Sequence, residues 1–218
     1  MPSLDLYKDH SPIREYIHRI HKQPQQCVYE FTGAGSQALY QLHEVAGSSA
    51  TILEANDRYA YKAVDDVCGF APERYCSEEV ARALADHAFK RALSLRDSKD
   101  TPVFGVGLSA SIASERPKRG LHQAYLAISN PLGVECQHLV LAKGQRTRQE
   151  EEALLSAWII MAMARASGIY PKYSPISRDD GLTVQSYPSD ILKRFFAREV
   201  SLLRYEQSQC DSSVVQLT

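Results

Sequence analysis

The sequence predicts an α/β fold, a three-layer α/β sandwich in which a mixed sheet lies between helices. Two observations lead to this prediction. In the first half of the chain, short apolar segments typical of strands alternate with amphipathic segments typical of helices. Between residues 103 and 142, three strand-like segments follow one another without a helix, which favours a mixed sheet over an all-parallel one.

The first element is a helix near the N-terminus. Ser11 and Pro12 mark its start, because serine caps helices and proline is favoured at the first helical position. Apolar residues between 13 and 20 recur at helical spacing and form one face. We therefore expect residues 1–26 to form an N-terminal helical extension.

The next elements belong to the main domain, which we expect to span residues 27–168. Its first half contains a strand over 27–31, a glycine-rich turn over 33–36, a helix over 37–45, a possible strand over 50–54 and a helix over 77–93. The last of these is the clearest. Ser77 caps it, and Glu78 and Glu79 suit the positive end of its dipole.

The second half of the domain contains strands over 103–108, 124–128 and 138–142 and a helix over 149–166. That helix is apolar on most sides, so we expect it in the core or in a subunit interface, and the protein is predicted to be a homo-oligomer. Three prolines favour a linker over 169–188. Residues 189–218 are expected to form an amphipathic helix and a disordered tail.

Length, charge and cysteine content limit the classes of function. The chain has 218 residues, 44% of them hydrophobic, and its formal net charge of −1 gives no reason to expect a nucleic acid as partner. No signal-peptide core begins the sequence, and the longest apolar stretch, 154–164, is too short to cross a bilayer. Five cysteines without a C-x-x-C motif fit a reducing compartment. We therefore expect a soluble cytoplasmic protein without a membrane partner.

No metal site and no cofactor are predicted. His18 and His21 lie one helical turn apart, but the sequence offers no third ligand near them. Trp158 and the methionines of the long helix are expected to pack in the core or an interface and not around a cofactor.

The glycine-rich turn is the segment best suited to bind an anion, because the first backbone N–H groups of a helix have no partner within it. Residues 33–38 match the dinucleotide-binding pattern G-x-G-x-x-A, and Glu54 lies where an acidic residue would contact the ribose. Against an NAD-binding Rossmann-type protein, Thr32 places a hydroxyl before the turn, and the expected βαβ repeats are missing. This interpretation is kept as an alternative.

The order of motifs between Tyr29 and Ala142 resembles the CinA C-terminal family, whose active members remove the amide from nicotinamide mononucleotide. The most specific match is the helix start S-E-E-V-A-R-A-L-A at residues 77–85. The family's [VI]-x-G-[AS]-S motif fits residues 45–49. Further matches follow in the same order at Tyr59, 67–69, 117–127, Gly144 and Arg146.

The resemblance implies a CinA C-terminal-like sandwich and a reaction, the hydrolysis of a linear amide in a pyridine nucleotide. A hydroxyl nucleophile would attack, and a lysine and a tyrosine would transfer the protons. The implied catalytic residues are Thr32, Tyr59 and Lys62. The implied substrate and phosphate ligands are Gly33, Gly35, Ser36, Ser109, Ser111 and Arg146. The expected partner is a small nucleotide similar to nicotinamide mononucleotide.

The catalytic set is incomplete when it is carried over position by position. Alignment without gaps from the [VI]-x-G-[AS]-S motif places the family serine on Thr32. If Glu30 is matched to the family glutamate instead, the serine position becomes Phe31 and no nucleophile remains. The family lysine falls on Val64, and the nearest amine is that of Lys62.

Two hypotheses stay open. A diverged hydrolase would use Thr32 with Lys62 and Tyr59 in altered geometry. A non-catalytic domain would keep a nucleotide pocket or act as an oligomerisation module, and some related domains precede a nucleotidylyltransferase-like domain. Loss of the base lysine lowers a rate by orders of magnitude, so the sequence favours the non-catalytic form. Arg146 has a structural alternative, which is pairing with the acids of 150–152.

Overall fold

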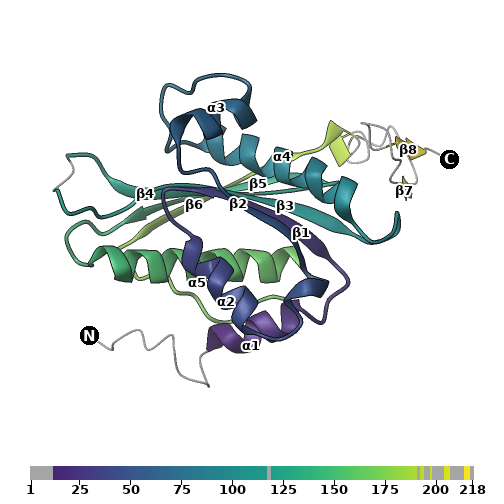
Figure 1. Ribbon diagram of the computed structural model, residues 1–218, viewed down its shortest axis with the longest axis horizontal. Coiled ribbons are helices and arrows are strands. Elements are labelled where there is room, and N and C mark those ends of the chain that lie inside the picture. Colours follow the sequence, from purple (N-terminus) through teal and green to yellow (C-terminus); the bar gives the residue numbers. More distant parts are fainter. Residues whose placement is uncertain are drawn as a thin grey trace.

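The computed structural model describes residues 12–116 and 119–190, the single residues Leu192, Lys193 and Ala197, and the backbone of two short strands beyond them. A six-stranded mixed sheet has helices on both faces, which confirms the predicted three-layer α/β sandwich (Figure 1). In chain order the elements are α1 (Pro12–Ile20), β1 (Gln26–Thr32), α2 (Ser36–Glu44), the 3-10 turn η1 (Ser48–Ala50), β2 (Ile52–Asp57), α3 (Tyr61–Cys68), α4 (Glu78–Leu95), β3 (Val103–Ser111), β4 (His122–Asn130), β5 (Gly133–Leu141), α5 (Arg148–Ala166), β6 (Gly181–Pro188), β7 (Arg204–Glu206) and β8 (Val214–Gln216).

The sheet has two halves that differ in strand direction. Its order is β2-β1-β3-β4-β5-β6. β2, β1 and β3 are parallel, because helices connect them, whereas β3 to β6 are antiparallel neighbours. An antiparallel half is foreign to the doubly wound, mostly parallel sheet of a Rossmann domain. The alternative interpretation as a Rossmann-type fold is therefore wrong.

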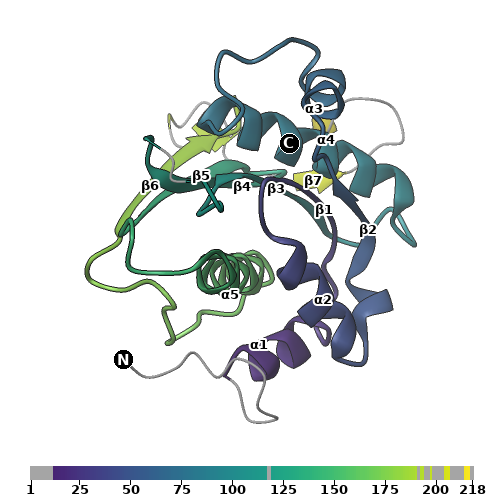
Figure 2. The ribbon, with the colours of Figure 1, turned by 60° about the vertical axis from the view of Figure 1, so that its left-hand side comes forward.

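The helices form two layers. Figure 2 shows α1, α2 and α5 on one face of the sheet and α3 and α4 on the other. The residues of α5 from Ala153 to Ala164 are all buried within the chain, which explains why this helix lacks a polar face. The structure thus places α5 in the core of the sandwich, the first of the two expected locations.

The layer of α4 packs very closely on β3. A side chain at Gly107 would place its Cβ 2.2 Å from the carbonyl oxygen of Ala81, and one at Gly105 would meet that of Ala85 at the same distance. Small residues on both elements therefore allow the helix backbone to approach the strand. This contact fixes the start of α4 over the carboxyl end of the sheet.

Two segments differ from the expectations. Residues 181–188, expected within a linker, form the edge strand β6, which pairs with β5 over eight residues. Its side chains are mostly exposed, so burial imposes little of the alternation that marks a strand in a sequence. At the other end, Ile13, Ile17 and Ile20 of α1 are buried in the main core, so this helix is part of the domain's packing and no separate extension. The predicted C-terminal tail and residues 1–11 lie largely outside the described residues.

Candidate functional site

A row of polar side chains crosses the sheet on the face covered by α4. Thr32, the last residue of β1, is the register partner of Ser109, and Ser109 is the partner of Tyr125. Tyr125 pairs with His138, which pairs with Thr183. Side chains that are direct partners lie on the same face of a sheet. This row joins the predicted nucleophile to positions that the sequence did not single out.

The segment over residues 75–77 covers the middle of this row. The Ser109 hydroxyl, which is fully buried, donates to the Tyr75 carbonyl oxygen at 2.5 Å and accepts from the Ser77 backbone N–H at 3.3 Å. The Cys76 thiol lies 3.6 Å from the carbonyl oxygens of Ser109 and Gln123. Ser109 thus holds the start of α4, and the row is divided into a Thr32 side and a Tyr125 side. The other predicted serine, Ser111, is partly buried at the end of β3, where Gln123 of β4 is its register partner.

The predicted proton-transfer residues lie on the surface. Tyr59 is 71% exposed, and Lys62 is exposed in the first turn of α3. Within the described residues, the Thr32 hydroxyl makes no hydrogen bond, and the catalytic roles of Thr32, Tyr59 and Lys62 stay predictions.

The glycines of the turn are required by packing. Gly33 and Gly35 both have positive φ angles, 84° and 101°. A Cβ on Gly33 would lie 2.0 Å from the Ala110 carbonyl oxygen, and one on Gly35 would lie 2.2 Å from the Tyr29 hydroxyl. That hydroxyl donates to the Gly35 carbonyl oxygen at 3.2 Å. The glycine spacing therefore has a structural reason that needs no dinucleotide.

The anion expected at the start of α2 is a side chain of the protein itself. Glu152 Oε1 accepts hydrogen bonds from the backbone N–H groups of Gly35 at 2.9 Å and Gln37 at 3.1 Å, and from the Ser36 hydroxyl at 3.3 Å. A carboxylate is favourable at this end of a helix dipole. Burial, and then the charge of Glu152, raises the pKa of Asp57 at the neighbouring strand end. Glu152 thus accepts from the donors of the turn, and the role of Gly33, Gly35 and Ser36 in binding a substrate phosphate stays a prediction.

Side chains in the first turn of α5 form hydrogen bonds with the glycine turn, with the segment at Ala113 and with His122 at the start of β4. Thr147 and Glu150 form a capping box. Arg148 donates to the carbonyl oxygens of Ala113 at 2.9 Å and Gly33 at 3.3 Å, so it is the arginine that contacts the glycine turn. Glu151, which is fully buried, accepts from the Ala113 backbone N–H at 2.6 Å and lies 2.7 Å from the His122 ring.

Arg146 lies against a different partner. Its guanidinium binds both oxygens of Asp180 at 2.8 Å and the Ser177 hydroxyl at 3.1 Å. Burial alone would raise the pKa of Asp180, but hydrogen bonds from Arg146, Ala142 and Ser177 outweigh it and lower the pKa. The close ion pair of Arg146 is thus with Asp180, while among the acids of 150–152 Glu150 has its pKa lowered by hydrogen bonds from Thr147 and, to a smaller extent, by the charge of Arg146. The phosphate-binding role of Arg146 stays a prediction.

Sequence reasoning missed a charged cluster on the Thr32 side. Glu30, fully buried on β1, accepts from Arg58 at 3.1 Å and lies 2.7 Å from His87 Nδ1. Glu30 Oε2 and Arg58 Nε are buried without a partner among the described residues. A charged residue inside an otherwise apolar strand was the available signal. Glu54, expected at a ribose, instead pairs with Arg91 at 2.8 Å.

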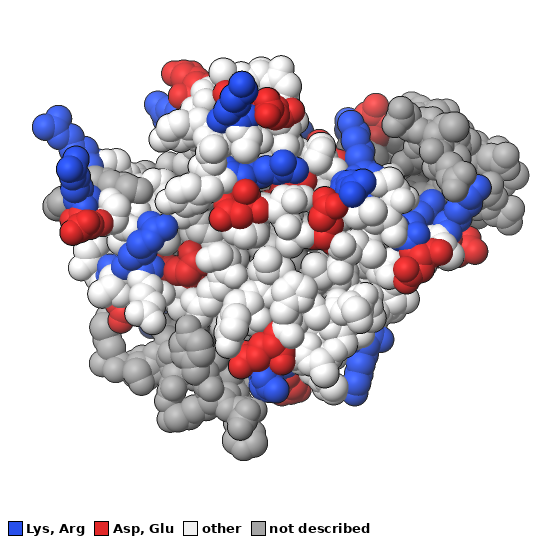
Figure 3. All heavy atoms as spheres, viewed as in Figure 1, with Lys and Arg blue, Asp and Glu red and all other residues white. Residues whose placement is uncertain are grey.

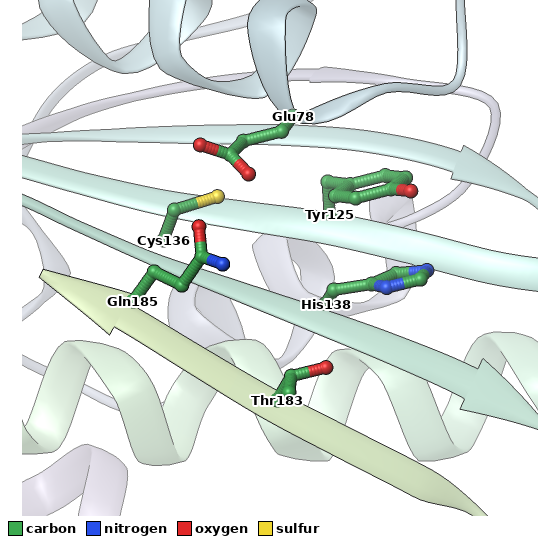
Figure 4. A pocket seen from close by; sticks show the side chains of 6 residues that line it. All are labelled: Glu78, Tyr125, Cys136, His138, Thr183 and Gln185. Carbon is green, nitrogen blue, oxygen red and sulfur yellow. The ribbon is translucent and has the colours of Figure 1, made fainter.

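A cavity of about 180 Å³ lies on the Tyr125 side of the row (Figure 4). Its lining comes from the start of α4 and from three antiparallel strands: Glu78, Tyr125, Cys136, His138, Thr183 and Gln185. The sequence could not reveal it, because β6 was not recognised as a strand.

Neither the surface charge seen in Figure 3 nor the metal-ligating side chains of the described residues indicate a further site. On the face drawn in Figure 3, basic and acidic residues alternate over the surface without a patch of one sign. Among the described residues, no cluster of three or more His, Cys, Asp or Glu side chains is placed to hold a metal ion. Within the same part of the chain, no helix has both the length and the apolar character needed to cross a membrane.

Comparison with known proteins gives a likeness in structure and none in sequence. No protein-family model and no curated protein matches the chain. A competence/damage-inducible protein from Agrobacterium tumefaciens superimposes with a TM-score of 0.52 at 22% identity, over 72% of this chain and 95% of that one. A CinA superfamily protein from Enterobacter cloacae gives 0.56 at 13% identity, over 75% and 97%. A competence or damage-inducible protein from Enterobacter asburiae gives 0.56 at 11%, over 71% and 96%. The chain thus has the fold of the CinA superfamily, as the order of its sequence motifs indicates.

Proposed function

We propose that this chain is a CinA-fold module that binds a small nucleotide-type ligand at the carboxyl end of β1 and does not hydrolyse it. The observation that carries the proposal is the environment of Thr32. Its hydroxyl has no hydrogen-bond partner among the described residues, and the two residues expected to transfer protons, Tyr59 and Lys62, lie on the surface.

The chemistry of amide hydrolysis explains why this environment matters. A threonine hydroxyl attacks an amide only if a neighbouring base takes its proton, and a positioned base contributes about 10²–10⁴-fold to the rate. The transition state also needs donors for the developing oxyanion. The donors at the start of α2 bind Glu152 instead. Both requirements therefore favour binding over turnover.

The same carboxylate limits how a nucleotide would bind. A phosphate at the start of α2 would have to displace Glu152 and would lie close to Asp57. Two anions sharing one site repel each other strongly. We therefore expect the ligand to be recognised through its base and sugar, and its phosphate to remain outside the turn.

Two measurements test the proposal. Ammonia release from nicotinamide mononucleotide, followed over hours at high protein concentration, should equal that of heat-denatured protein. Nicotinamide mononucleotide and its nucleoside should both raise the melting temperature, with affinities that differ by less than about threefold. Absence of any shift with either ligand would contradict the binding function.

A diverged hydrolase is the second candidate, and the half-buried position of Thr32 at the carboxyl end of β1, where the resemblance places the nucleophile, favours it. This candidate predicts ammonia release that Thr32→Ala abolishes. The matched control is Ser98→Ala, which removes an exposed hydroxyl from a distant loop. Release that survives in the control and disappears in Thr32→Ala would replace the binding proposal with the enzymatic one.

A further inference from the structure

The cavity in Figure 4 has the size of a single ring. Its volume is about 180 Å³. One water occupies about 30 Å³ of liquid, and pockets for drug-sized ligands begin near about 300 Å³. A free heteroaromatic ring fits such a volume.

Two stacked rings form one wall of the cavity. Tyr125 and His138 are direct register partners, and their ring centroids lie 4.1 Å apart with planes inclined by 2°. On its other side His138 has Thr183 as register partner, and Figure 4 shows the imidazole between the two residues. A planar ligand lying on the open face of His138 would continue the stack above Thr183. Such stacking accepts any flat π-system.

The polar groups of the cavity include two hydrogen-bond acceptors that lack a proton. His138 Nε2 lies 2.9 Å from the Gln123 amide oxygen, so this nitrogen carries the ring proton. Burial lowers the pKa of His138, which keeps the ring neutral and leaves Nδ1 as an acceptor. Glu78 uses Oε1 to accept from the Tyr187 hydroxyl at 2.5 Å, and its second oxygen is a further acceptor.

The remaining polar groups of the lining are the Tyr125 and Thr183 hydroxyls, the Gln185 amide and the Cys136 thiol. Burial raises the pKa of the Cys136 thiol to about 12, so the sulfur stays protonated at neutral pH. Thr183 contributes a hydroxyl that can donate or accept. A thiol in this state does not attack a substrate, and the cavity is therefore suited to binding and not to covalent chemistry.

We infer that this cavity binds one planar heteroaromatic ring bearing an amino group, such as an aminopyrimidine, with its amine directed to Glu78 and its face on the His138 imidazole. A carboxylate is the acceptor that selects an exocyclic amine on such a ring. The site is distinct from the one proposed at Thr32, because the segment over residues 75–77 lies between them. The inference thus goes beyond the proposed function.

The test uses cytosine as the probe and uracil as its matched control. The two rings have the same size, but uracil carries a carbonyl oxygen where cytosine carries the amine. The readout is the NMR signal of the His138 ring protons, which the Tyr125 stack shifts from their usual position. Millimolar cytosine should move this signal saturably, and uracil should bind at least about tenfold more weakly. Equal binding of both rings, or no saturable change with cytosine, would overturn the inference.

Two substitutions at the start of α4 separate recognition from helix stability. Glu78→Gln removes the charged acceptor and should weaken cytosine binding by about tenfold or more. Glu79→Gln removes an exposed carboxylate from the same helix turn and should leave the affinity unchanged. Equal losses in both variants would mean that the helix dipole, and not the cavity, carries the effect, and would overturn the inference. Repeating the titration with cytidine distinguishes a free base from a nucleoside as the source of the ring.

Discussion

The carboxylate of Glu152 lies 2.9 Å from the backbone nitrogen of Gly35, so the chain supplies its own anion to the start of α2. Gln37 N–H and the Ser36 hydroxyl donate to the same oxygen. In a helix these donors have no partner of their own, and an uncompensated loss of a charged acceptor is unfavourable. These contacts of Glu152 with residues 35–37 hold α5 against the glycine turn, and we call them the clamp.

Glu152→Ala should lower the free energy of unfolding by about 1–2 kcal/mol, because it leaves the donors of Gly35 and Gln37 without their charged acceptor. Urea denaturation measures the loss. Glu44→Ala is the matched control. It removes an exposed carboxylate from the C-terminal end of α2, the helix whose start Glu152 caps, and a negative charge is unfavourable at that end. We expect the control to be neutral or slightly stabilising. A loss in the control equal to that of Glu152→Ala would contradict the clamp.

Phosphate should rescue the Glu152→Ala variant in part. Removal of the carboxylate exposes donors at a helix start, where phosphate is a favourable guest. The melting temperature of the variant should rise in phosphate buffer more than in sodium chloride of equal ionic strength, and this difference should be larger in the variant than in the wild-type protein, which phosphate stabilises only through its general effect on burial. Identical behaviour of both proteins would mean that the turn stays closed to anions without Glu152.

Glu30→Ala should be more harmful than a change at a surface pair. Glu30 is fully buried and is the shared partner of Arg58 and His87, so its removal leaves a partly buried guanidinium uncompensated. We expect a loss of about 2–3 kcal/mol in the free energy of unfolding. This is below the full range for a buried ion pair, because the side chains of Arg58 and His87 reach solvent. Glu54→Ala, which breaks the more exposed pair with Arg91, should cost much less. Equal losses by urea denaturation would contradict this ranking.

The layers of the fold could be predicted because the elements that build them follow their local signals. Ser77 caps α4 by accepting from the Val80 backbone N–H at 3.3 Å, as its position before Glu78 and Glu79 indicates. The edge strand β6 was missed, because a strand exposed on both faces carries no binary pattern.

The candidate site was less accessible to sequence reasoning, because its decisive contacts are distant in the chain. Glu152 and Gly35 are 117 residues apart, and nothing in a single sequence pairs them. The acids of 150–152 look like an ordinary solvated helix start. In the structure, Glu150 caps α5, Glu151 binds His122 and Glu152 caps α2. Tertiary partners, and not local pattern, gave these three neighbours their different roles.

Stability should fall as the pH drops below 6.5, and His21 should contribute to the fall. Burial lowers the pKa of His21, whose ring is held between the Thr51 hydroxyl and the Leu42 carbonyl oxygen at 2.9 Å from each. The unfolded chain therefore binds a proton at a higher pH than the folded one. The stabilisation is fully present above the unfolded value of 6.5 and is lost as the pH falls toward the lower folded pKa.

The experiment compares the free energies of unfolding at neutral pH and at about pH 5 for the wild-type protein and for His21→Gln. The variant should lose less on acidification. Some pH dependence should remain in it, because burial also lowers the pKa of His138. Identical pH profiles for both proteins would show that protonation of His21 is not linked to unfolding.

Gly35→Ala should be far more destabilising than Gly144→Ala, although both glycines have positive φ angles of 101° and 80°. Each substitution forces a left-handed backbone on alanine, at a cost of about 1–2 kcal/mol. A Cβ at Gly144 meets nothing within 4 Å, so the backbone strain is its whole effect. At Gly35 the Cβ would lie 2.2 Å from the Tyr29 hydroxyl, which is itself buried and cannot withdraw.

Tyr29→Phe separates the two terms at Gly35, because it removes the hydroxyl that the new Cβ would meet. It also removes the bond to the Gly35 carbonyl oxygen, so the single variant should be destabilised by about 1 kcal/mol. The double variant should then be more stable than the sum of the single losses by more than about 0.5 kcal/mol, which thermal denaturation of all four proteins measures. Strict additivity would mean that the backbone or the Leu108 side chain, 2.7 Å from the new Cβ, and not the tyrosine, demands glycine at this position. Coupling would instead show that the buried Tyr29 hydroxyl requires glycine at position 35, as the Ala110 carbonyl oxygen does at position 33, so that two separate contacts produce a dinucleotide-like pattern in a chain without the Rossmann fold.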